Sequence, residues 1–556
     1  MWNYICVSGF FLIVSFLYHY YITIQPVSVI QYPKENYDYI VVGAGTAGCV
    51  IASRLSESPN TTVLLIEAGG YFNWLTTVPL AAPLMQSTNV DWSYKTESQY
   101  YSSRALKNFQ QLWPRGKGLG GSGQLNYLVH SFGIADDYKD WPPGWSYADL
   151  QPYFRKVSSI MNLPGTEPDG PLLDALIRVD TTLFDGKVTI EKAKNTIKRG
   201  GRWSTFNAYL QNAWNRENFH ILTDTLVTKI LFNNKSIVEG IKVRFGSENF
   251  KIINVNRELI VCAGAIGSPH LMMVSGIGPF DQLQSNQVPI IRNIPQIGKN
   301  LYDHLNLPMY VNLKMPVSIT LRKMQTIAEL IKYFIFETGL LATNGIIGNI
   351  VRNNSSVVLF GVGSTDEKLL KDVANFKTES FRSLFPSYNN NSWEGFLYLI
   401  NCMKPRSRGN ITLASDSILD PPKIDPAYLE YAEDILCTQD GIRLALEVLN
   451  TESFRKLGAK VHLPNIKECR HFHQDYDNPD YSECIIRYAA LTGHHPGGTC
   501  RMGVDNDSVV DDKLMVNGVK KLRIVDASII PNPMSGTPNS VIIAIAERAV
   551  DIIREN

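Results

Sequence analysis

The sequence has almost no net charge and few cysteines. Its 53 Lys and Arg residues balance 52 Asp and Glu residues, which leaves a formal net charge of +1. The eight cysteines form no CxxC pair and no His/Cys cluster, so the spacing argues against a structural zinc site, and we expect no metal. The lack of charge excess and of biased segments excludes a nucleic-acid-binding or disordered protein. The 556 residues therefore predict a globular chain of roughly two to four domains.

Long apolar runs are also scarce, and the most apolar one lies at the N-terminus. Ile5 to Leu17 is uncharged and apolar, and the run continues to Ile24 with only polar interruptions. No Lys or Arg precedes it and no Ala-x-Ala site follows it, so a cleaved signal peptide and an uncleaved anchor both remain open for residues 1–24. Either segment predicts a secreted protein or a membrane-anchored one that faces the lumen or the outside.

Two further patterns agree with such a compartment. Asn-x-Ser/Thr triplets predict a glycoprotein, with acceptors at Asn60, Asn234, Asn353, Asn354, Asn390, Asn410 and Asn506. Cys469 and Cys484 flank a loop rich in Asp, His, Asn and Pro. An oxidising compartment would allow these two cysteines to form a disulfide, although spacing alone does not fix the pairing.

The clearest local unit is a strand, a glycine turn and a helix. A buried strand over residues 39–42 precedes Gly43-x-Gly45-x-x-Gly48, and after the helix a second strand ends in Glu67. Gly43 permits a tight turn, Gly45 lets a pyrophosphate approach the backbone, and Gly48 lets the helix pack on the strand. Glu67 stands 19 residues after Gly48, near the spacing of an acid that binds a ribose hydroxyl. The unit predicts an adenine dinucleotide site for FAD or NAD.

A second stretch, "PRGKGLGGSGQLNYLVHSFG" at residues 114–133, is unusually rich in glycine. Glycines at 116, 118, 120, 121 and 123 are too dense for the interior of a stable helix or strand. Because glycine has no Cβ atom, this density predicts that a ligand outside the chain lies directly against the loop.

The first part of that loop, "PRGKGLGGSGQLN", resembles a signature of the glucose-methanol-choline (GMC) family of FAD-dependent oxidoreductases. It departs from the signature at two positions. The family usually has a side chain at the position of Gly118 and a second Ser or similar small residue at the position of Gly123. Three other segments resemble the family in the same order: "AGAIGSPHLMMVSGIGP" (263–279), "GKNLYDHL" (298–305) and "GHHPGGTCRMG" (493–503) with the C-terminal region after it. In the first of these, the local pattern predicts a helix with Ser268 as N-cap and Pro269 as its first residue.

The resemblance implies a fold of class α/β plus α+β. A Rossmann-type FAD-binding domain would be discontinuous, over residues 36–160, 220–310 and 490–556. A substrate-binding domain, an antiparallel sheet covered by helices, would fill residues 161–219 and 311–489.

The resemblance also implies two catalytic residues. The family's catalytic His directly precedes the Pro of "GHHPGG", which selects His495 as the base rather than His494. An ordinary His pKa of about 6.5 leaves such a base mostly neutral near pH 7. The second catalytic position falls on Asn539, which would hydrogen bond the substrate oxygen, cap the C-terminal helix, or do both. His304 beside Asp303 is interpreted as a structural pair.

The cofactor would contact residues from the two glycine segments, one strand and the C-terminal region. These are Gly43, Gly45, Thr46, Ala47, Gly48, Glu67, Ala68, Gly120, Asn126, Tyr127, Leu128, Val129, Val227, Asp526 and Ala527. Val227 fits a plain core strand equally well. Some family members attach FAD covalently through a His immediately before the loop Asn. Because Leu125 stands at that position, we expect FAD to be bound non-covalently.

The activity implied is that of a dehydrogenase or oxidase similar to choline dehydrogenase or glucose dehydrogenase. The carbinol hydride of a small-molecule alcohol would pass to flavin N5 and its proton to His495, giving an aldehyde or ketone. Oxygen, a quinone or another acceptor would then reoxidise the flavin. One alternative is an NAD-dependent dehydrogenase, in which the second glycine loop and the His/Asn pair have no obvious use. Another is a family flavoprotein whose FAD is structural, either a lyase or a non-catalytic binding protein.

Overall fold

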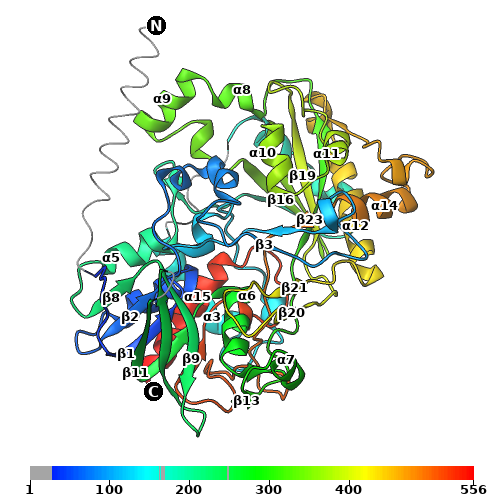
Figure 1. The fold of residues 1–556 in the computed structure, drawn as a ribbon. Helices are drawn as coiled ribbons and strands as arrows, with labels where there is room; N and C mark the ends of the chain where they lie inside the picture. The colour runs from blue at the N-terminus through cyan, green and yellow to red at the C-terminus, as the bar shows by residue number, and fades with distance from the viewer. Residues whose placement is uncertain (1–27, 162, 164–168, 247–248, 556) are drawn as a thin grey trace.

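The fold is described by a computed structural model for residues 28–161, 163, 169–246 and 249–555. The predicted leader, residues 1–24, lies outside these residues. None of the helices within the described ranges is long and apolar enough to cross a membrane. Figure 1 shows two bodies, one built around β1, β2, β8, β9 and β11 and the other around β16 and β19.

The first body contains a seven-stranded sheet of order β8-β2-β1-β11-β10-β9, with β24 also paired to β11. The strands are β1 (Asn36–Val42), β2 (Val63–Ile66), β8 (Phe219–Leu222), β9 (Thr225–Phe232), β10 (Val238–Phe245), β11 (Asn249–Val261) and β24 (Leu522–Ile524). β8, β2, β1, β11 and β24 are parallel, whereas β10 and β9 are antiparallel. The parallel strands are buried on both faces, which is why β1 and β2 read as nearly continuous apolar runs.

The second body contains an antiparallel sheet of order β22-β14-β19-β17-β16-β5, with β23 also paired to β14. The strands are β5 (Val188–Lys192), β14 (Leu305–Asn312), β16 (Ile346–Arg352), β17 (Ser355–Phe360), β19 (Gly395–Cys402), β22 (Lys460–Val461) and β23 (Leu491–Thr492). Residues alternate along β19 between a fully buried face and a partly exposed one. Helix α12 packs on the buried face, where Gly441 lies against Ile400. The limits of the two predicted domains remain a prediction.

Helices surround both sheets. They are α2 (Thr46–Leu55), α3 (Tyr147–Ile160), α4 (Pro171–Ile177), α5 (Gln211–Ala213), α6 (Gly264–Val274), α7 (Phe280–Ser285), α8 (Leu321–Met324), α9 (Ile327–Phe336), α10 (Glu367–Val373), α11 (Thr378–Leu384), α12 (Ala432–Leu449), α13 (Glu452–Lys456), α14 (Pro479–Ala489) and α15 (Asn539–Glu555). The remaining strands form short pairs: β3 (Tyr94–Lys95), β4 (Leu112–Trp113), β6 (Ile197–Lys198), β7 (Gly201–Arg202), β12 (Ile277–Gly278), β13 (Arg292–Asn293), β15 (Ile319–Thr320), β18 (Val362–Ser364), β20 (Asn410–Thr412) and β21 (Lys423–Asp425).

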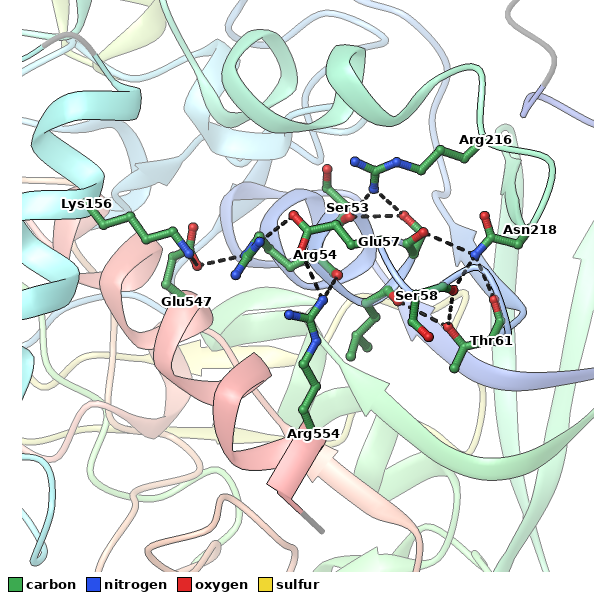
Figure 2. Close-up of polar contacts among 12 residues, drawn as sticks. Ser53, Arg54, Glu57, Ser58, Thr61, Lys156, Arg216, Asn218, Glu547 and Arg554 are labelled. Atoms are coloured by element: carbon green, nitrogen blue, oxygen red, sulfur yellow. Dashed lines mark hydrogen bonds and ion pairs between the residues drawn. The ribbon is translucent and has the colours of Figure 1, made fainter.

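Helices α2 and α15 pack in parallel, so their N-termini lie together. Thr46 Oγ1 donates to Asn539 Oδ1 at 3.0 Å, and eight residues further along each helix Arg54 Nε donates to Glu547 Oε2 at 3.1 Å. Glu547 is buried and also accepts from Lys156 Nζ at 2.6 Å, as Figure 2 shows. A carboxylate as buried as that of Glu547 requires partners of opposite charge, which the partly exposed Arg54 and Lys156 provide. This cluster therefore holds Asn539 firmly beside the start of α2.

Helix α6 begins earlier than the sequence pattern predicts. Its first residue is Gly264, so Ser268 and Pro269 lie inside the helix and the predicted N-cap is wrong. A proline inside a helix has no N–H to donate to the carbonyl four residues before it. The hydroxyl of Thr499 donates to that carbonyl, Ala265 O, at 2.6 Å instead. A contact from the distant C-terminal region thus allows the helix to continue through the proline.

Two disulfides lie in the second body. The Cys469–Cys484 bridge is present, as its loop suggested, and a second bridge joins Cys402 at the end of β19 to Cys437 in α12. No local pattern in the sequence predicts the second bridge. This bridge joins α12 covalently to β19, the strand that α12 covers.

Candidate active site

A cavity of about 1040 Å³ joins the start of α2, the segment after the second glycine loop, the exposed face of the antiparallel sheet and the start of α15. The predicted site residues that line it are Thr46, Asn126, Tyr127, Leu128, Val129, His495 and Asn539. The structure therefore brings both predicted catalytic residues to one cavity, next to part of the predicted cofactor set. The remaining predicted cofactor residues lie outside its lining.

The glycine turn after β1 has the geometry that its motif predicts. Gly43 has φ +98°, and a Cβ on Gly48 would lie 1.9 Å from the carbonyl oxygen of Gly43. Gly45 differs, because a Cβ there would meet only the Cα of Gly121, at 4.0 Å. Helix α2 starts next to it with Thr46 and Ala47 and has no side-chain cap. An open glycine beside an uncapped helix N-terminus fits a pyrophosphate group.

Glu67 lies at the end of β2, against the glycine turn. Its carboxylate accepts from the backbone N–H groups of Ala44 at 2.8 Å and Gly69 at 3.0 Å. Burial raises the pKa of Glu67 to about 7, against the opposing effect of these N–H groups. Each carboxylate oxygen can accept more than one hydrogen bond, so the group still fits a ribose hydroxyl. Ala68 follows it directly.

Val227 lies close to this acid. The backbone N–H of Thr225, two residues earlier on β9, donates to the carbonyl oxygen of Glu67 at 2.9 Å. Val227 is buried and pairs with Val243 of β10. Val227 therefore serves the core, and its predicted backbone contact to an adenine ring stays a prediction.

The second glycine loop packs on the first turn. The N–H of Gly120 donates to the carbonyl oxygen of Ala44 at 2.7 Å. A Cβ on Gly121 would lie 2.6 Å from the Cα of Gly45, and one on Gly116 would lie 2.1 Å from the carbonyl oxygen of Gly121. The prediction that an external ligand explains these glycines is therefore wrong for Gly116 and Gly121. Close contacts within the chain require them.

The segment after this loop is held in place by its neighbours. Asn126 Oδ1 accepts from Arg202 Nη1 at 2.7 Å, and Leu128 has φ +64°. The carbonyl oxygen of Val129 accepts from Thr537 Oγ1 at 3.0 Å, which ties the segment to the residues before α15. Tyr127 stacks on the ring of His494, with centroids 6.5 Å apart.

Asp526 and Ala527 join α6 to the end of β24. Asp526 Oδ2 accepts from the Gly264 N–H at 2.9 Å and from the Ser268 hydroxyl at 2.5 Å, while Oδ1 accepts from the Ser528 N–H at 2.8 Å. These three hydrogen bonds from within the chain engage both oxygens of the Asp526 carboxylate. Any contact with a cofactor at this position is more readily made by the backbone.

His495 is half-buried among polar neighbours. Its backbone N–H donates to Asp303 Oδ1 at 2.6 Å, and its Nδ1 lies 2.9 Å from Nδ1 of His304. Asp303 also accepts from the hydroxyls of Thr492 and Tyr428. Burial, with smaller effects of His304, His494 and Arg115, holds the pKa of His495 well below its usual value. The ring is therefore neutral near pH 7.

His304 determines which nitrogen of His495 carries a proton. Nε2 of His304 lies 2.7 Å from the carbonyl oxygen of Met403, which can only accept, so this Nε2 carries the hydrogen. Burial lowers the pKa of His304 as well. In the neutral ring its Nδ1 is an acceptor, and Nδ1 of His495 must be the donor. Nε2 of His495 then holds a lone pair, and no residue in the described ranges hydrogen bonds to it.

Asp303 and His304, interpreted from the sequence as a structural pair, each contact His495, and that interpretation stays a prediction. No hydrogen bond or ion pair joins their side chains in the described part of the chain; Asp303 instead holds the backbone of His495, and His304 contacts its ring. Sequence reasoning did not predict the contact between the rings of His304 and His495. The available signal was its place in the segment "GKNLYDHL".

His494 also lines the cavity, but no hydrogen bond within the described residues orients its ring for proton transfer. Its Nδ1 is buried without a hydrogen-bond partner among the described residues, and its backbone has φ +61°. Its carbonyl oxygen accepts from Arg115 Nη2 at 2.9 Å. Burial lowers the pKa of His494 to about 3.

Asn539 uses its side-chain oxygen to accept from Thr46, the first residue of α2. Its amide NH₂ group then remains as a donor at the wall of the cavity. The site therefore combines a neutral His with a free lone pair and an amide donor.

Comparisons with known proteins point to one family. Residues 37–306 and 405–546 match the two family models described as GMC oxidoreductase. The chain is 34% identical to the Drosophila melanogaster protein called "Neither inactivation nor afterpotential protein G" over 93% of this chain and 90% of that protein. It is 32% identical to glucose dehydrogenase [FAD, quinone] of the same organism, over 94% of this chain and 87% of that enzyme.

Two solved structures have the same fold. Pyridoxine 4-oxidase from Mesorbium loti superposes with a TM-score of 0.76 at 25% identity, covering 94% of this chain and all of the other. Formate oxidase from Aspergillus oryzae superposes with a TM-score of 0.77 at 22% identity, covering 94% of this chain and 99% of the other. The predicted pair of a dinucleotide-binding unit and an antiparallel-sheet unit is thereby confirmed as the fold class.

Proposed function

Because the chain belongs to the GMC oxidoreductase family, we propose that it is an FAD-dependent enzyme that oxidises the CH–OH group of an alcohol to an aldehyde or ketone. FAD, when bound, supplies the hydride acceptor, the N5 atom of its flavin ring. The chain's own residues must then bind the alcohol, orient its carbon and take up the hydroxyl proton.

The observation that carries this proposal is the hydrogen-bonded series from Met403 O through His304 to His495. It leaves Nε2 of His495 as a neutral base at the cavity wall. After His495 takes the hydroxyl proton on Nε2, its Nδ1–H faces the lone pair of His304 Nδ1. A hydrogen bond from a charged donor is stronger than one from a neutral donor, so His304 stabilises the protonated base as it forms.

Asn539 supports the same step from the other side. The Thr46 hydroxyl holds its amide oxygen, and the NH₂ group can donate to the substrate oxygen while His495 removes the proton. Because the Glu547 cluster fixes α15, this donor is in position before substrate binds.

The turn residues Gly43, Gly45 and Gly48, together with Glu67, would hold the adenosine and pyrophosphate part of FAD. Residues 126–129 would contact the flavin. At the position before Asn126 the buried side chain of Leu125 has no atom that could bond to the flavin. We therefore propose that FAD is held without a covalent bond.

A secreted location and an oxidising compartment are proposed with the same function. The two disulfides support this proposal, because such bridges persist mainly outside the cytosol. The name of the Drosophila glucose dehydrogenase relative specifies a quinone as acceptor. For this chain, oxygen and a quinone both remain candidate acceptors.

The test is anaerobic addition of an alcohol to the purified yellow protein. The proposal predicts that the absorbance of oxidised flavin disappears without added NAD⁺ and that an aldehyde or ketone appears in equal amount. If no alcohol bleached a correctly folded, FAD-loaded protein, the structural-FAD alternative would replace this proposal.

A further inference from the structure

The cavity-facing side of the antiparallel sheet changes from polar to apolar with distance from His495. Its nearest row consists of Asn306, Asn401 and Ser356, which are register partners across β14, β19 and β17. This row lies beside the catalytic loop because Asn306 pairs with Leu491, four residues before His495. It offers hydrogen-bonding side chains close to the proposed base.

The next two rows are formed by larger, mostly hydrocarbon surfaces. In register, they are Pro308, Leu399 and Val358, followed by Tyr310, Leu397 and Phe360. The hydroxyl of Tyr310 donates to the carbonyl oxygen of Gly363, so it is already satisfied. Rows on one face are two residues apart, so these lie about 7 Å and 13 Å from the polar row.

Helices α10 and α11 and the residues beside them add a second apolar wall to the same cavity. Their contribution consists of Leu369, Leu370, Val373, Phe376, Phe381 and Phe385. Part of the rim is apolar as well, since the cavity is also lined by Leu84, whose side chain is 45% exposed, and by Leu330 of α9.

Charged groups are confined to the outer part of the cavity or already have partners. Glu191, Lys192, Lys194 and Asp366 line it but are exposed to solvent. Arg115 donates to the carbonyl oxygens of Pro114 and His494. A buried charge requires a partner of opposite sign, and the residues of the two rows on β14, β19 and β17 offer none. In the same register, Asn349 of β16 and the exposed Glu191 of β5 extend the first of these rows to the edge of the sheet.

We propose that the substrate is a lipophilic alcohol, with its carbinol carbon beside His495 and Asn539 and a long apolar body lying along the rows of Leu399 and Leu397. This inference rests on the function proposed above and specifies its substrate class. A hydroxyl-rich sugar or a small cation such as choline would leave these rows without matching contacts.

The experiment measures anaerobic flavin reduction by straight-chain primary alcohols from butanol to dodecanol, with glucose and choline for comparison. Burial of each added methylene should raise the rate constant of reduction divided by Kd about fourfold until the rows are filled. A value independent of chain length, or a higher value for glucose or choline, would overturn the inference and leave the proposed function intact.

Binding of ligands that cannot be oxidised distinguishes the proposed substrate class from the proposed function. Decanamide and butanamide have no carbinol group, and their binding can be followed by the change in the flavin absorbance spectrum. Tighter binding of decanamide in a protein that no alcohol reduces would refute the function while supporting the apolar site. Equal, weak binding of both amides would refute the apolar site.

A variant of the sheet tests whether the apolar rows cause the dependence of flavin reduction on chain length. Leu399→Asn should lower decanol reduction about tenfold, because a side chain that an alkyl body covers becomes polar. Butanol is too short to reach this row and should react as before. Val504→Asn, at a side chain that is 72% exposed, is the control and should change neither reaction. If Leu399→Asn fails to retain FAD, Leu397→Gln in the next row provides the same test, and an unchanged decanol rate in a folded variant would contradict the proposal.

Discussion

Replacing His304 by Phe removes the acceptor that faces His495 Nδ1 while keeping a ring of similar size. In the protonated state of His495, the lost contact is a hydrogen bond to a charged group, which contributes about 1.5–3 kcal/mol. At about 1.4 kcal/mol per factor of ten, the hydride-transfer step should slow by about 10- to 150-fold. FAD should remain bound, because His304 contacts His495 and Met403 rather than the residues of the glycine turn.

Anaerobic stopped-flow reduction of the flavin by a saturating alcohol measures this effect directly. His304→Asn should recover part of the rate, because an amide oxygen can accept from Nδ1 of His495. The control is His471→Phe at an exposed histidine, which should reduce at the wild-type rate. A His304→Phe protein that holds FAD and reduces within twofold of wild type would refute the role given to this side chain.

Three further results are expected. Because burial holds the pKa of His495 well below its usual value and the base must be neutral, the reduction rate should stay constant from about pH 8 to pH 6 and fall only below that range; a fall centred near pH 6.5 would contradict this. Glu67→Ala should raise the dissociation constant of FAD about 10- to 150-fold, through loss of an acceptor for the ribose hydroxyls, as titration of the apoprotein would show. Acid or heat denaturation followed by filtration should release all the yellow flavin, whereas flavin retained on the precipitated chain would mean that the Leu125 argument fails.

The parts of the fold that sequence predicts best are those whose partners are close along the chain. The turn from Gly43 to Gly48 is an example, because the strand, glycines and helix determine one another within a few residues. The Cys469–Cys484 bridge spans 15 residues around one loop, and the sequence allowed this pairing without fixing it. The Cys402–Cys437 bridge spans 35 residues and depends on α12 packing on β19, which no local pattern indicates.

The candidate site was predicted less completely because its contacts are distant in sequence. His304 and His495 are 191 residues apart, and only the fold shows that their rings meet. The glycine loop illustrates a different limit. Its composition indicates that Cβ atoms are not tolerated, but not that Gly121 lies against the backbone of Gly45 rather than against a ligand. Similarly, Pro269 suggested a helix start because the contact from Thr499 cannot be seen in the local sequence.

The most direct test of the central claim compares His495→Ala with His494→Ala in a single turnover without oxygen. If Nε2 of His495 is the base, His495→Ala should retain FAD and reduce it about 10² to 10⁴-fold more slowly than wild type, the usual contribution of a positioned acid–base group. His494→Ala should have a much smaller effect, since no hydrogen bond orients its Nδ1 in the described structure. Flavin reduction that is slowed more by His494→Ala than by His495→Ala would contradict the account.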